Sequence, residues 1–177
     1  CSGEMSSTIV RHSKAAQSDS SRKPEELPPW RYVNSGWVSP IDQQSIGAFS
    51  KELRADVITS ASELEEFNST VINKRIRGTG VTLNRADFPE SVVLVAYLMW
   101  LPVQGDPLSV IDIEIDGRYV VVYLELNEKP QGREYPYLLA PMTMVALDRS
   151  EFPVDGSVSF DFVLDDELQL TLNYDLQ

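Results

Sequence analysis

The chain contains almost no cysteine or histidine, with one residue of each among 177. The cysteine is Cys1 and the histidine is His12, so residues 30–177 contain neither side chain and no internal disulfide can form. Histidine-dependent triads and dyads need an imidazole held within hydrogen-bond reach of the nucleophile. Zinc sites usually draw on several His or Cys ligands. The composition therefore excludes both kinds of site from residues 30–177.

Nucleotide-binding glycine motifs and long hydrophobic runs are also missing. The chain has no P-loop, no G-x-G-x-x-G motif and no twelve-residue calcium loop with its acid spacing. The longest apolar run, residues 92–101, has ten residues, whereas a transmembrane helix needs about 20. We therefore expect no catalytic residues, no metal site and no cofactor, and we expect that the protein is not an enzyme.

Cys1 is followed by Ser2, Gly3 and Glu4, and a lone cysteine in this place predicts the acylated residue of a mature bacterial lipoprotein. A free thiol and an intermolecular disulfide are the alternatives. Each buried methylene of an acyl chain contributes about 0.8 kcal/mol, so two or three chains hold a protein at a membrane durably. We expect a covalent lipid on Cys1, membrane contact through this anchor only, and a place in the bacterial cell envelope on the periplasmic or outer-surface side.

The first 29 residues differ in composition from the rest of the chain. They are rich in serine and end in a charged stretch with three prolines, Lys-Pro-Glu-Glu-Leu-Pro-Pro. Such a segment buries too little apolar surface to offset the loss of chain entropy on folding. We therefore expect a lipidated flexible tether at residues 1–29 and a single β-rich globular domain at residues 30–177.

Acidic residues concentrate in the domain. Residues 1–29 hold four acids and four bases, so the whole formal net charge of −12 belongs to residues 30–177. Residues 148–177 alone carry eight acids against one base, Arg149. This charge repels phosphate backbones, so we expect no nucleic-acid binding, and it attracts basic proteins or cations. A solvated strand face that maintains solubility is the simpler alternative.

Two groups of residues are candidates for partner binding. The first consists of acids near the C-terminus, and the second of aromatic residues that stack on a sugar or a partner, or else pack in the fold. The candidates are Asp155, Asp161, Asp165, Asp166, Glu167, Trp30 and Trp37.

The hydrophobic pattern predicts one helix and several strands. Ser60 and Glu63 have the spacing of a capping box, and apolar residues follow at helical intervals, which predicts a helix over residues 60–73. Residues 30–41 are a predicted strand. Residues 92–101 are a continuous apolar run rich in β-branched side chains, as expected of a strand buried on both faces.

Two hairpins are predicted after this strand. Asp116-Gly117 is a turn signal between residues 109–116 and 119–126, and Asp165-Asp166 separates a second pair of strands. Alternation predicts two rows of inward-facing apolar side chains, Ile111, Ile113 and Ile115 in one strand and Leu168, Leu170, Leu172 and Tyr174 in another. The expected fold is mainly β, an antiparallel sandwich or partial barrel with one packed helix, preceded by an extended N-terminal tail.

Carboxylates are the remaining chemical groups of interest. Asp112, Glu114 and Asp116 share one face of a strand, and a further acid set crowds the turn at residues 165–167. Either set could hold a hard cation weakly or supply an acid/base pair. Two alternatives thus stay beside a non-catalytic role: a carboxylate-dependent enzyme, and a periplasmic glycan- or peptide-binding lipoprotein that uses tryptophan as a stacking platform.

Residues 60–148 resemble the C-terminal domain of PrcB-like lipoproteins, a family of bacterial protease-complex subunits. The matching features are a short helix ending in Phe67, the sequence Ala-Asp-Phe-Pro-Glu at residues 86–90 before a strand, and Pro136-Tyr137 before the strand at residues 141–146. Residues 104–108, Gln-Gly-Asp-Pro-Leu, stand where such domains tend to have a Gly-Gly-Tyr turn. The resemblance implies a non-catalytic β-rich module that supports a larger membrane-associated complex, and it brings no catalytic residues.

The function that follows from these observations is non-enzymatic. We expect a membrane-anchored lipoprotein that acts as an accessory or structural subunit of a larger membrane protein complex. The acidic face is expected to dock a basic partner, such as a basic soluble protein.

We predict that Cys1 carries a thioether-linked lipid in the native protein. Material purified from membranes of the source organism should have an intact mass above that of the 19.9 kDa chain by the mass of the attached acyl groups. An unmodified mass, together with a thiol that reacts with maleimide, would contradict the lipid anchor.

Overall fold

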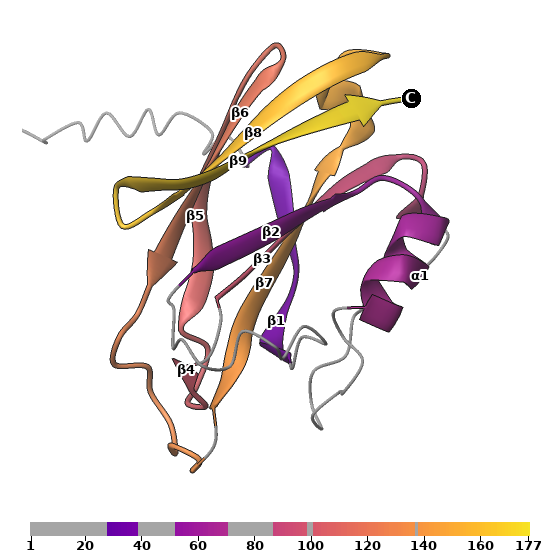
Figure 1. The fold of residues 1–177 in the computed structure, drawn as a ribbon. Coiled ribbons are helices and arrows are strands. Elements are labelled where there is room, and N and C mark those ends of the chain that lie inside the picture. The colour runs from indigo at the N-terminus through magenta and orange to yellow at the C-terminus, as the bar shows by residue number, and fades with distance from the viewer. Residues whose placement is uncertain (1–27, 39–51, 71–86, 99–100, 137) are drawn as a thin grey trace, which may run out of the picture.

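The structure is a computed structural model that describes residues 28–38, 52–70, 87–98, 101–136 and 138–177. Two β-sheets pack face to face, and one helix lies against the far side of one of them (Figure 1). The expectation of a mainly β fold with one packed helix is confirmed, and the two sheets form a sandwich, not a closed barrel. The tether predicted at residues 1–29 lies almost entirely outside the described residues.

The first sheet has five strands in the order β1-β7-β3-β2, with the short β4 paired to β7. All these pairings are antiparallel. The central strand β3 is buried on both faces from Val92 to Leu98, as its unbroken apolar run predicted. The bounds are β1 Trp30–Val38, β2 Leu53–Ile58, β3 Ser91–Leu98, β4 Leu101–Pro102 and β7 Leu138–Asp148.

The second sheet has four strands in the order β5-β6-β8-β9. Both predicted hairpins are present as β5–β6 and β8–β9, and the two hairpins meet through a parallel pairing of β6 with β8. A short 3-10 helix, η3 Arg149–Glu151, follows β7 before the chain enters this sheet. The bounds are β5 Leu108–Asp116, β6 Tyr119–Leu126, β8 Gly156–Leu164 and β9 Glu167–Leu176.

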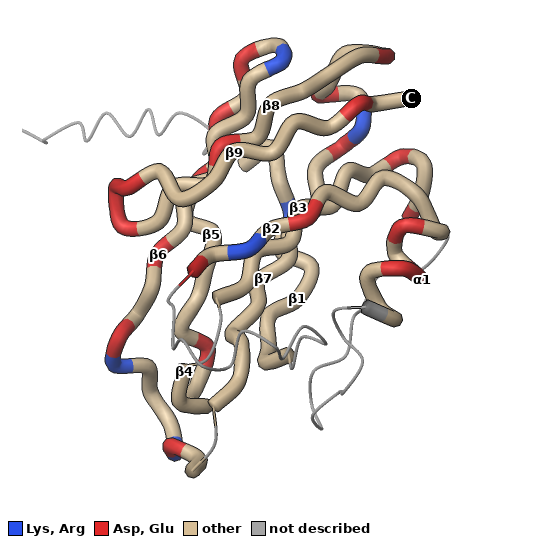
Figure 2. Tube along the Cα trace, viewed as in Figure 1, with Lys and Arg blue, Asp and Glu red and all other residues tan. Residues whose placement is uncertain are grey.

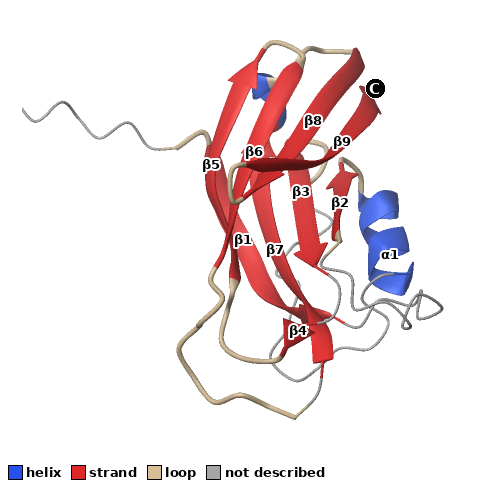
Figure 3. Ribbon diagram, turned by 60° about the vertical axis from the view of Figure 1, so that its left-hand side comes forward, coloured by secondary structure: helices blue, strands red, loops and turns tan. Residues whose placement is uncertain are grey.

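The main core lies between the two sheets (Figure 3). Every second residue of β6 and of β8 faces inward, and Phe160 and Phe162 of β8 are completely buried. A second buried cluster lies on the opposite side of the five-stranded sheet, where Leu64 and Phe67 of the helix pack with Val93 of β3. The five-stranded sheet is therefore buried on both sides, whereas within the described residues no helix or strand packs over the outer side of the four-stranded sheet.

The helix, α1 Ala61–Thr70, begins with the predicted capping box. Ser60 Oγ accepts a hydrogen bond from the backbone N–H of Glu63 at 3.2 Å, and Glu63 Oε2 accepts one from the backbone N–H of Ser60 at 3.1 Å. Glu63 Oε2 also accepts from the Thr59 backbone N–H at 2.7 Å, and Glu63 Oε1 accepts from the hydroxyl of Tyr174. Because Tyr174 belongs to β9, these bonds tie the start of α1 to the edge of the four-stranded sheet.

Two β-bulges overturn part of the predicted alternation. In β5, Val110 pairs with Leu124 and Asp112 with Tyr123, which leaves Ile111 as the extra residue. The prediction that Ile111 faces inward is therefore wrong, and its side chain is 56% exposed.

The second bulge lies in β9. Phe162 pairs with Leu170 and Val163 with Leu168, so Gln169 is the extra residue. Leu168 pairs with an outward-facing residue instead of the inward-facing Leu164, and it is 60% exposed. Its predicted inward position is also wrong.

Strand β2 was not predicted either. It is the six-residue edge strand LRADVI, whose mixture of apolar and charged residues gives a short and ambiguous pattern. These residues form a strand because they pair with the strongly apolar β3, which local sequence does not indicate. Residues 39–41 of the first predicted strand and residues 71–73 of the predicted helix lie outside the described residues.

We predict that Glu63 makes the stability of the fold depend on pH. Burial raises the pKa of this carboxyl, but the hydrogen bonds from Tyr174, Thr59 and Ser60 outweigh burial and hold the pKa below its ordinary value of 4.5. Such a group stabilises the fold above its unfolded pKa, and the stabilisation is lost as the pH falls through the lower folded pKa. Glu63→Gln keeps a hydrogen-bond acceptor but loses the charge that strengthens these bonds, so it should reduce the free energy of unfolding at pH 7 by about 0.5–1 kcal/mol.

Urea unfolding at pH 7 and at pH 3 measures this dependence. The difference between wild type and Glu63→Gln should shrink at the lower pH, because lowering the pH shifts the Glu63 carboxyl towards its protonated form. Glu52→Gln makes the same charge change at an exposed position away from α1 and serves as the control. An equal difference at both pH values would contradict the role assigned to the Glu63 carboxylate.

Candidate functional site: the acidic face of the four-stranded sheet

The outer side of the four-stranded sheet carries side chains from all four strands in regular rows. Directly paired residues of neighbouring strands share one face of a sheet, with Cβ atoms about 4.5–5.5 Å apart. One row runs Asp116, Tyr119, Ser159, Asn173, the next Glu114, Val121, Asp161, Thr171, and the third Asp112, Tyr123, Val163, Leu168.

Acids also stand at both ends of these rows. The β8–β9 turn and the first residue of β9 contribute Asp165, Asp166 and Glu167, all exposed, and the loop before β8 contributes Asp155 at the opposite end. We call this surface, the outer side of the sheet with the turns at its ends, the acidic face. Its carboxylates belong to Asp112, Glu114, Asp116, Glu125, Asp155, Asp161, Asp165, Asp166, Glu167 and Asp175.

Positive charge is nearly absent from the acidic face. Within residues 108–126 and 155–176, which form the sheet and its turns, Arg118 is the only base. Its guanidinium donates to the backbone carbonyls of Asp155 at 2.9 Å and Ser157 at 3.3 Å. Arg118 lies in the turn between β5 and β6, and the other charged residues of this sheet, whose strands can be followed in Figure 2, are acids.

Hydrogen bonds hold several acids of the face in place. The hydroxyl of Thr171 donates to Asp161 Oδ1 at 2.5 Å, and the hydroxyl of Tyr123 donates to Glu114 Oε2 at 3.2 Å. The backbone N–H of Leu126 donates to Asp165 Oδ1 at 3.3 Å. Desolvation, followed by the hydrogen bond and charge of Glu114 and the charge of Asp112, raises the pKa of Tyr123.

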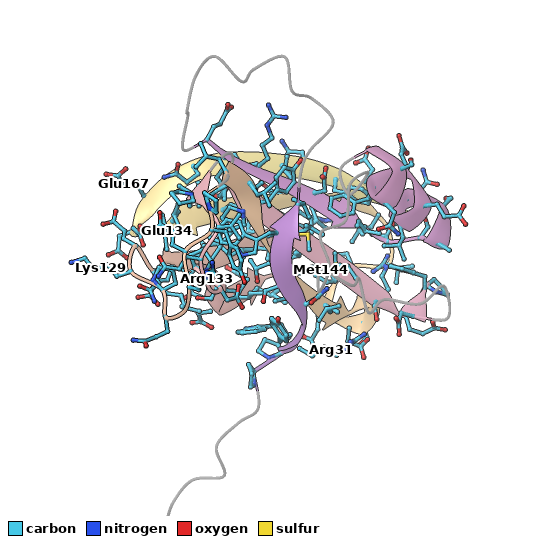
Figure 4. The ribbon with its side chains drawn as sticks, turned by 90° about the horizontal axis from the view of Figure 1, so that it is seen from below. Arg31, Lys129, Arg133, Glu134, Met144 and Glu167 are labelled. Carbon is cyan, nitrogen blue, oxygen red and sulfur yellow. The ribbon has the colours of Figure 1, made fainter. Side chains whose placement is uncertain are left out.

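The acidic candidates from the sequence meet on this face. Asp161 lies near its centre, Asp165, Asp166 and Glu167 at one end, and Asp155 at the other. Figure 4 shows Glu167 at the outer edge of the molecule, away from Arg31 of β1. Nη2 of Arg31 lies 3.8 Å from Oδ1 of Asp87, with which it forms an ion pair.

The two tryptophan candidates lie elsewhere, in β1 of the other sheet. The indole of Trp37 is 7% exposed and its Nε1–H donates to the carbonyl of Gly105 at 2.9 Å, so this side chain packs within the fold. Trp30 is half-buried against the main core and lines a cavity of about 320 Å³ together with Arg31, Glu90 and Asp148. Its Nε1 is buried and has no hydrogen-bond partner among the residues that the structure describes. The structure therefore does not bring the tryptophans to the acidic residues.

Several residues of the face were outside the predicted partner-binding set. The acids of β5, at positions 112, 114 and 116, were noted only as carboxylates on one side of a strand. The hairpin turn at Asp116-Gly117 was the signal that could have joined them to β6. Nothing in the local pattern indicated that Ile111 and Leu168 are exposed, because their exposure follows from the two bulges, and the bulges depend on how neighbouring strands pair.

A second group of carboxylates lines a cleft beside α1. This cleft, of about 390 Å³, is lined by Asp56, Glu63, Glu66 and Tyr97 over apolar residues. Burial raises the pKa of Asp56, and burial followed by the charge of Asp56 raises that of Tyr97 to about 12. The carboxylate of Glu63 is engaged by Thr59, Ser60 and Tyr174, which makes the cleft a weak candidate for acid/base catalysis.

Among the described residues, no group of three His, Cys, Asp or Glu is placed to hold a metal ion. Within the same residues, no helix has both the length and the apolar character needed to cross a membrane.

Comparison with protein-family models, with curated proteins and with solved structures gives no match for this chain. The resemblance of residues 60–148 to PrcB-like lipoproteins stays a prediction from the sequence.

We predict that Asp166→Gly stabilises the domain. Asp165 and Asp166 both have left-handed backbone conformations, with φ of 50° and 67°, which glycine adopts without steric cost. The substitution also removes one of three adjacent carboxylates. The free energy of unfolding in urea should rise by about 0.5–1 kcal/mol, after allowance for the greater freedom of glycine in the unfolded chain. Asp175→Gly, inside β9, is the control and should destabilise; a loss of stability in Asp166→Gly would contradict the prediction.

Proposed function

We propose that this protein is a non-enzymatic accessory subunit of a larger membrane protein complex, and that its acidic face binds a basic protein. The observation that carries the proposal is the outer side of the four-stranded sheet. It presents acids from four strands, it includes one base, and within the described residues no secondary-structure element covers it.

Electrostatics favour a protein with a basic surface over other partners. Phosphate backbones and anionic lipid head groups are repelled by a surface of this charge. A basic protein is attracted before contact, and complementary charge raises the rate of association and excludes acidic competitors. The single base of the sheet, Arg118, is held on backbone carbonyls and leaves the sign of the surface unchanged.

The membrane part of the proposal rests on the sequence. Cys1 lies outside the described residues, so the lipid anchor and the position in the bacterial cell envelope stay predictions. The resemblance to PrcB-like lipoproteins also points to a supporting role in a membrane-associated complex. An anchored domain with one uncovered, strongly charged sheet face is suited to that role, because the anchor confines it beside the complex and the face selects the protein it contacts.

One specific observation supports a second candidate, the binding of a glycan or peptide. The cavity beside Trp30 has the size of a small ligand site and combines an aromatic ring with Arg31 and Glu90. The support is weaker, because the indole Nε1 of Trp30 is itself buried and Trp37 is packed inside the fold. Carboxylate-dependent catalysis gains no comparable support.

Native co-purification tests the proposed function. Full-length wild type, expressed in the source organism and extracted from membranes with mild detergent, should co-purify with at least one protein of basic isoelectric point. The variant Asp112→Asn/Glu114→Gln/Asp161→Asn removes three charges from the acidic face and should lose that protein. Raising the salt concentration should release it from wild type, since screening weakens contacts between exposed charges.

A matched control variant distinguishes binding by the acidic face from binding by the overall net charge. Glu52→Gln/Glu65→Gln/Glu151→Gln removes three charges at exposed positions outside the acidic face and should retain the partner. Equal loss from both triple variants would assign binding to net charge alone. Wild type that runs as a lone chain of about 20 kDa would contradict the subunit role.

A further inference from the structure

The acidic face has an apolar centre. Along β6, the outward positions are Tyr119, Val121 and Tyr123. Tyr123 pairs with Val163 of β8, and Val163 pairs with Leu168 of β9. Neighbouring outward positions of a strand lie about 7 Å apart and paired residues about 5 Å apart, so these five side chains form one continuous stripe. We call this set the apolar stripe.

The apolar stripe is accessible to a partner. Two of its five side chains are among the large hydrophobic residues that are exposed in the described part of the chain, Tyr119 at 70% and Leu168 at 60%, and the other three are half-buried. Ile111 of β5, at 56%, is a further exposed apolar residue of the same sheet. Monomeric soluble proteins seldom expose large contiguous apolar patches, and where they do the patch is often a binding site.

The two β-bulges create part of this exposure. Without the extra residue Gln169, Leu168 would pair with Leu164 and face the core. Without the bulge in β5, Ile111 would take the inward place that Val110 occupies opposite Leu124. Both bulges lie in edge strands, where bulges commonly redirect a side chain, and both increase the apolar character of the same face.

Carboxylates frame the apolar stripe. Asp112, Glu114 and Asp116 stand beside it on β5, and Asp161 stands next to Val121. The β8–β9 turn adds three more acids, at residues 165–167, immediately before Leu168. This arrangement is that of a protein interface, with an apolar centre inside a polar rim, in which the aromatic residues of the centre carry much of the binding energy.

We infer that the occupant of the acidic face is a basic protein surface whose own centre is apolar, and that the apolar stripe contacts that centre. This inference rests on the proposed function and adds the chemistry of the contact. A uniformly cationic chain would pair with the carboxylates around the apolar stripe and leave the stripe itself exposed to water. A second copy of this chain is excluded by charge, because it would place two acidic faces together.

Two peptides of equal charge serve as probes. Both have seven residues with lysine at alternate positions; the first carries serine between the lysines, and the second carries leucine, tyrosine and leucine. Isothermal titration of the full chain at low salt should give at least about tenfold tighter binding of the second peptide, as expected when a few apolar side chains are buried at an interface.

Surface variants test whether the apolar stripe causes the difference in affinity between the two peptides. Tyr119→Ser/Leu168→Ser should bring the affinity for the second peptide down to that for the first, and should leave the first unchanged. Val154→Ser is the matched control, because Val154 is 86% exposed but lies in the loop before β8, away from the apolar stripe. All three positions are exposed, so the fold should be retained, and circular dichroism checks that it is.

The outcomes separate this inference from the proposed function. Equal binding of both peptides, lost in Asp112→Asn/Glu114→Gln/Asp161→Asn, would overturn the apolar contact and support the basic partner. Tighter binding of the apolar peptide that persists in the same acid variant would support the stripe and count against the charge-based proposal. Failure of both peptides to bind at millimolar concentration would overturn both.

Discussion

The packing of two sheets through one shared core is the constraint on which the rest of this molecule depends. Successive residues of a strand point to opposite sides, so burial of Val120, Val122 and Leu124 obliges the residues between them to face away from the core. The same holds in β8, where the two buried phenylalanines alternate with outward positions. In the part of the chain that the structure describes, the five-stranded sheet meets apolar neighbours on both of its sides, and the four-stranded sheet meets them on one side. The acidic face is therefore a direct result of how the core is built.

This arrangement brings together acids that lie far apart in the chain. Those of β5 and those of β8 and β9 are separated by about 50 residues, and the parallel pairing of β6 with β8 joins them into one surface. The nearby arginines do little to neutralise it. Arg118 bonds to carbonyls at the start of β8, and Arg149 donates to the carbonyls of Pro153 and Val154 at 2.7 Å each. The bases therefore hold the loop before β8 in place and pair with none of the acids on the face.

Much of the fold could be predicted from local pattern, and the candidate site only in part. The capping box at Ser60 and Glu63, the hairpin turn at Asp116-Gly117 and the apolar run of β3 each depend on residues close together in sequence. The parallel pairing of β6 with β8 brings together two strands that are separated by β7 and η3, and no local pattern indicates it. The bulges are harder still to predict, because an extra residue in an edge strand can be recognised only from its register with the neighbouring strand. Sequence reasoning therefore identified half of the acids of the face as partner-binding candidates, Asp155, Asp161 and residues 165–167, and missed the apolar part of the site.

The two components of the acidic face suit different stages of binding. Charge acts over about 8–10 Å at physiological ionic strength, so the acids guide a basic protein before contact and mainly affect the rate of association. Apolar contact acts only after water has left the interface, and it mainly slows dissociation. The acids also keep the exposed stripe from associating with other copies of the chain, because any such contact brings like charges together. A face with apolar side chains inside a carboxylate frame can thus stay in solution and still bind a partner of opposite charge, a combination that neither component provides alone.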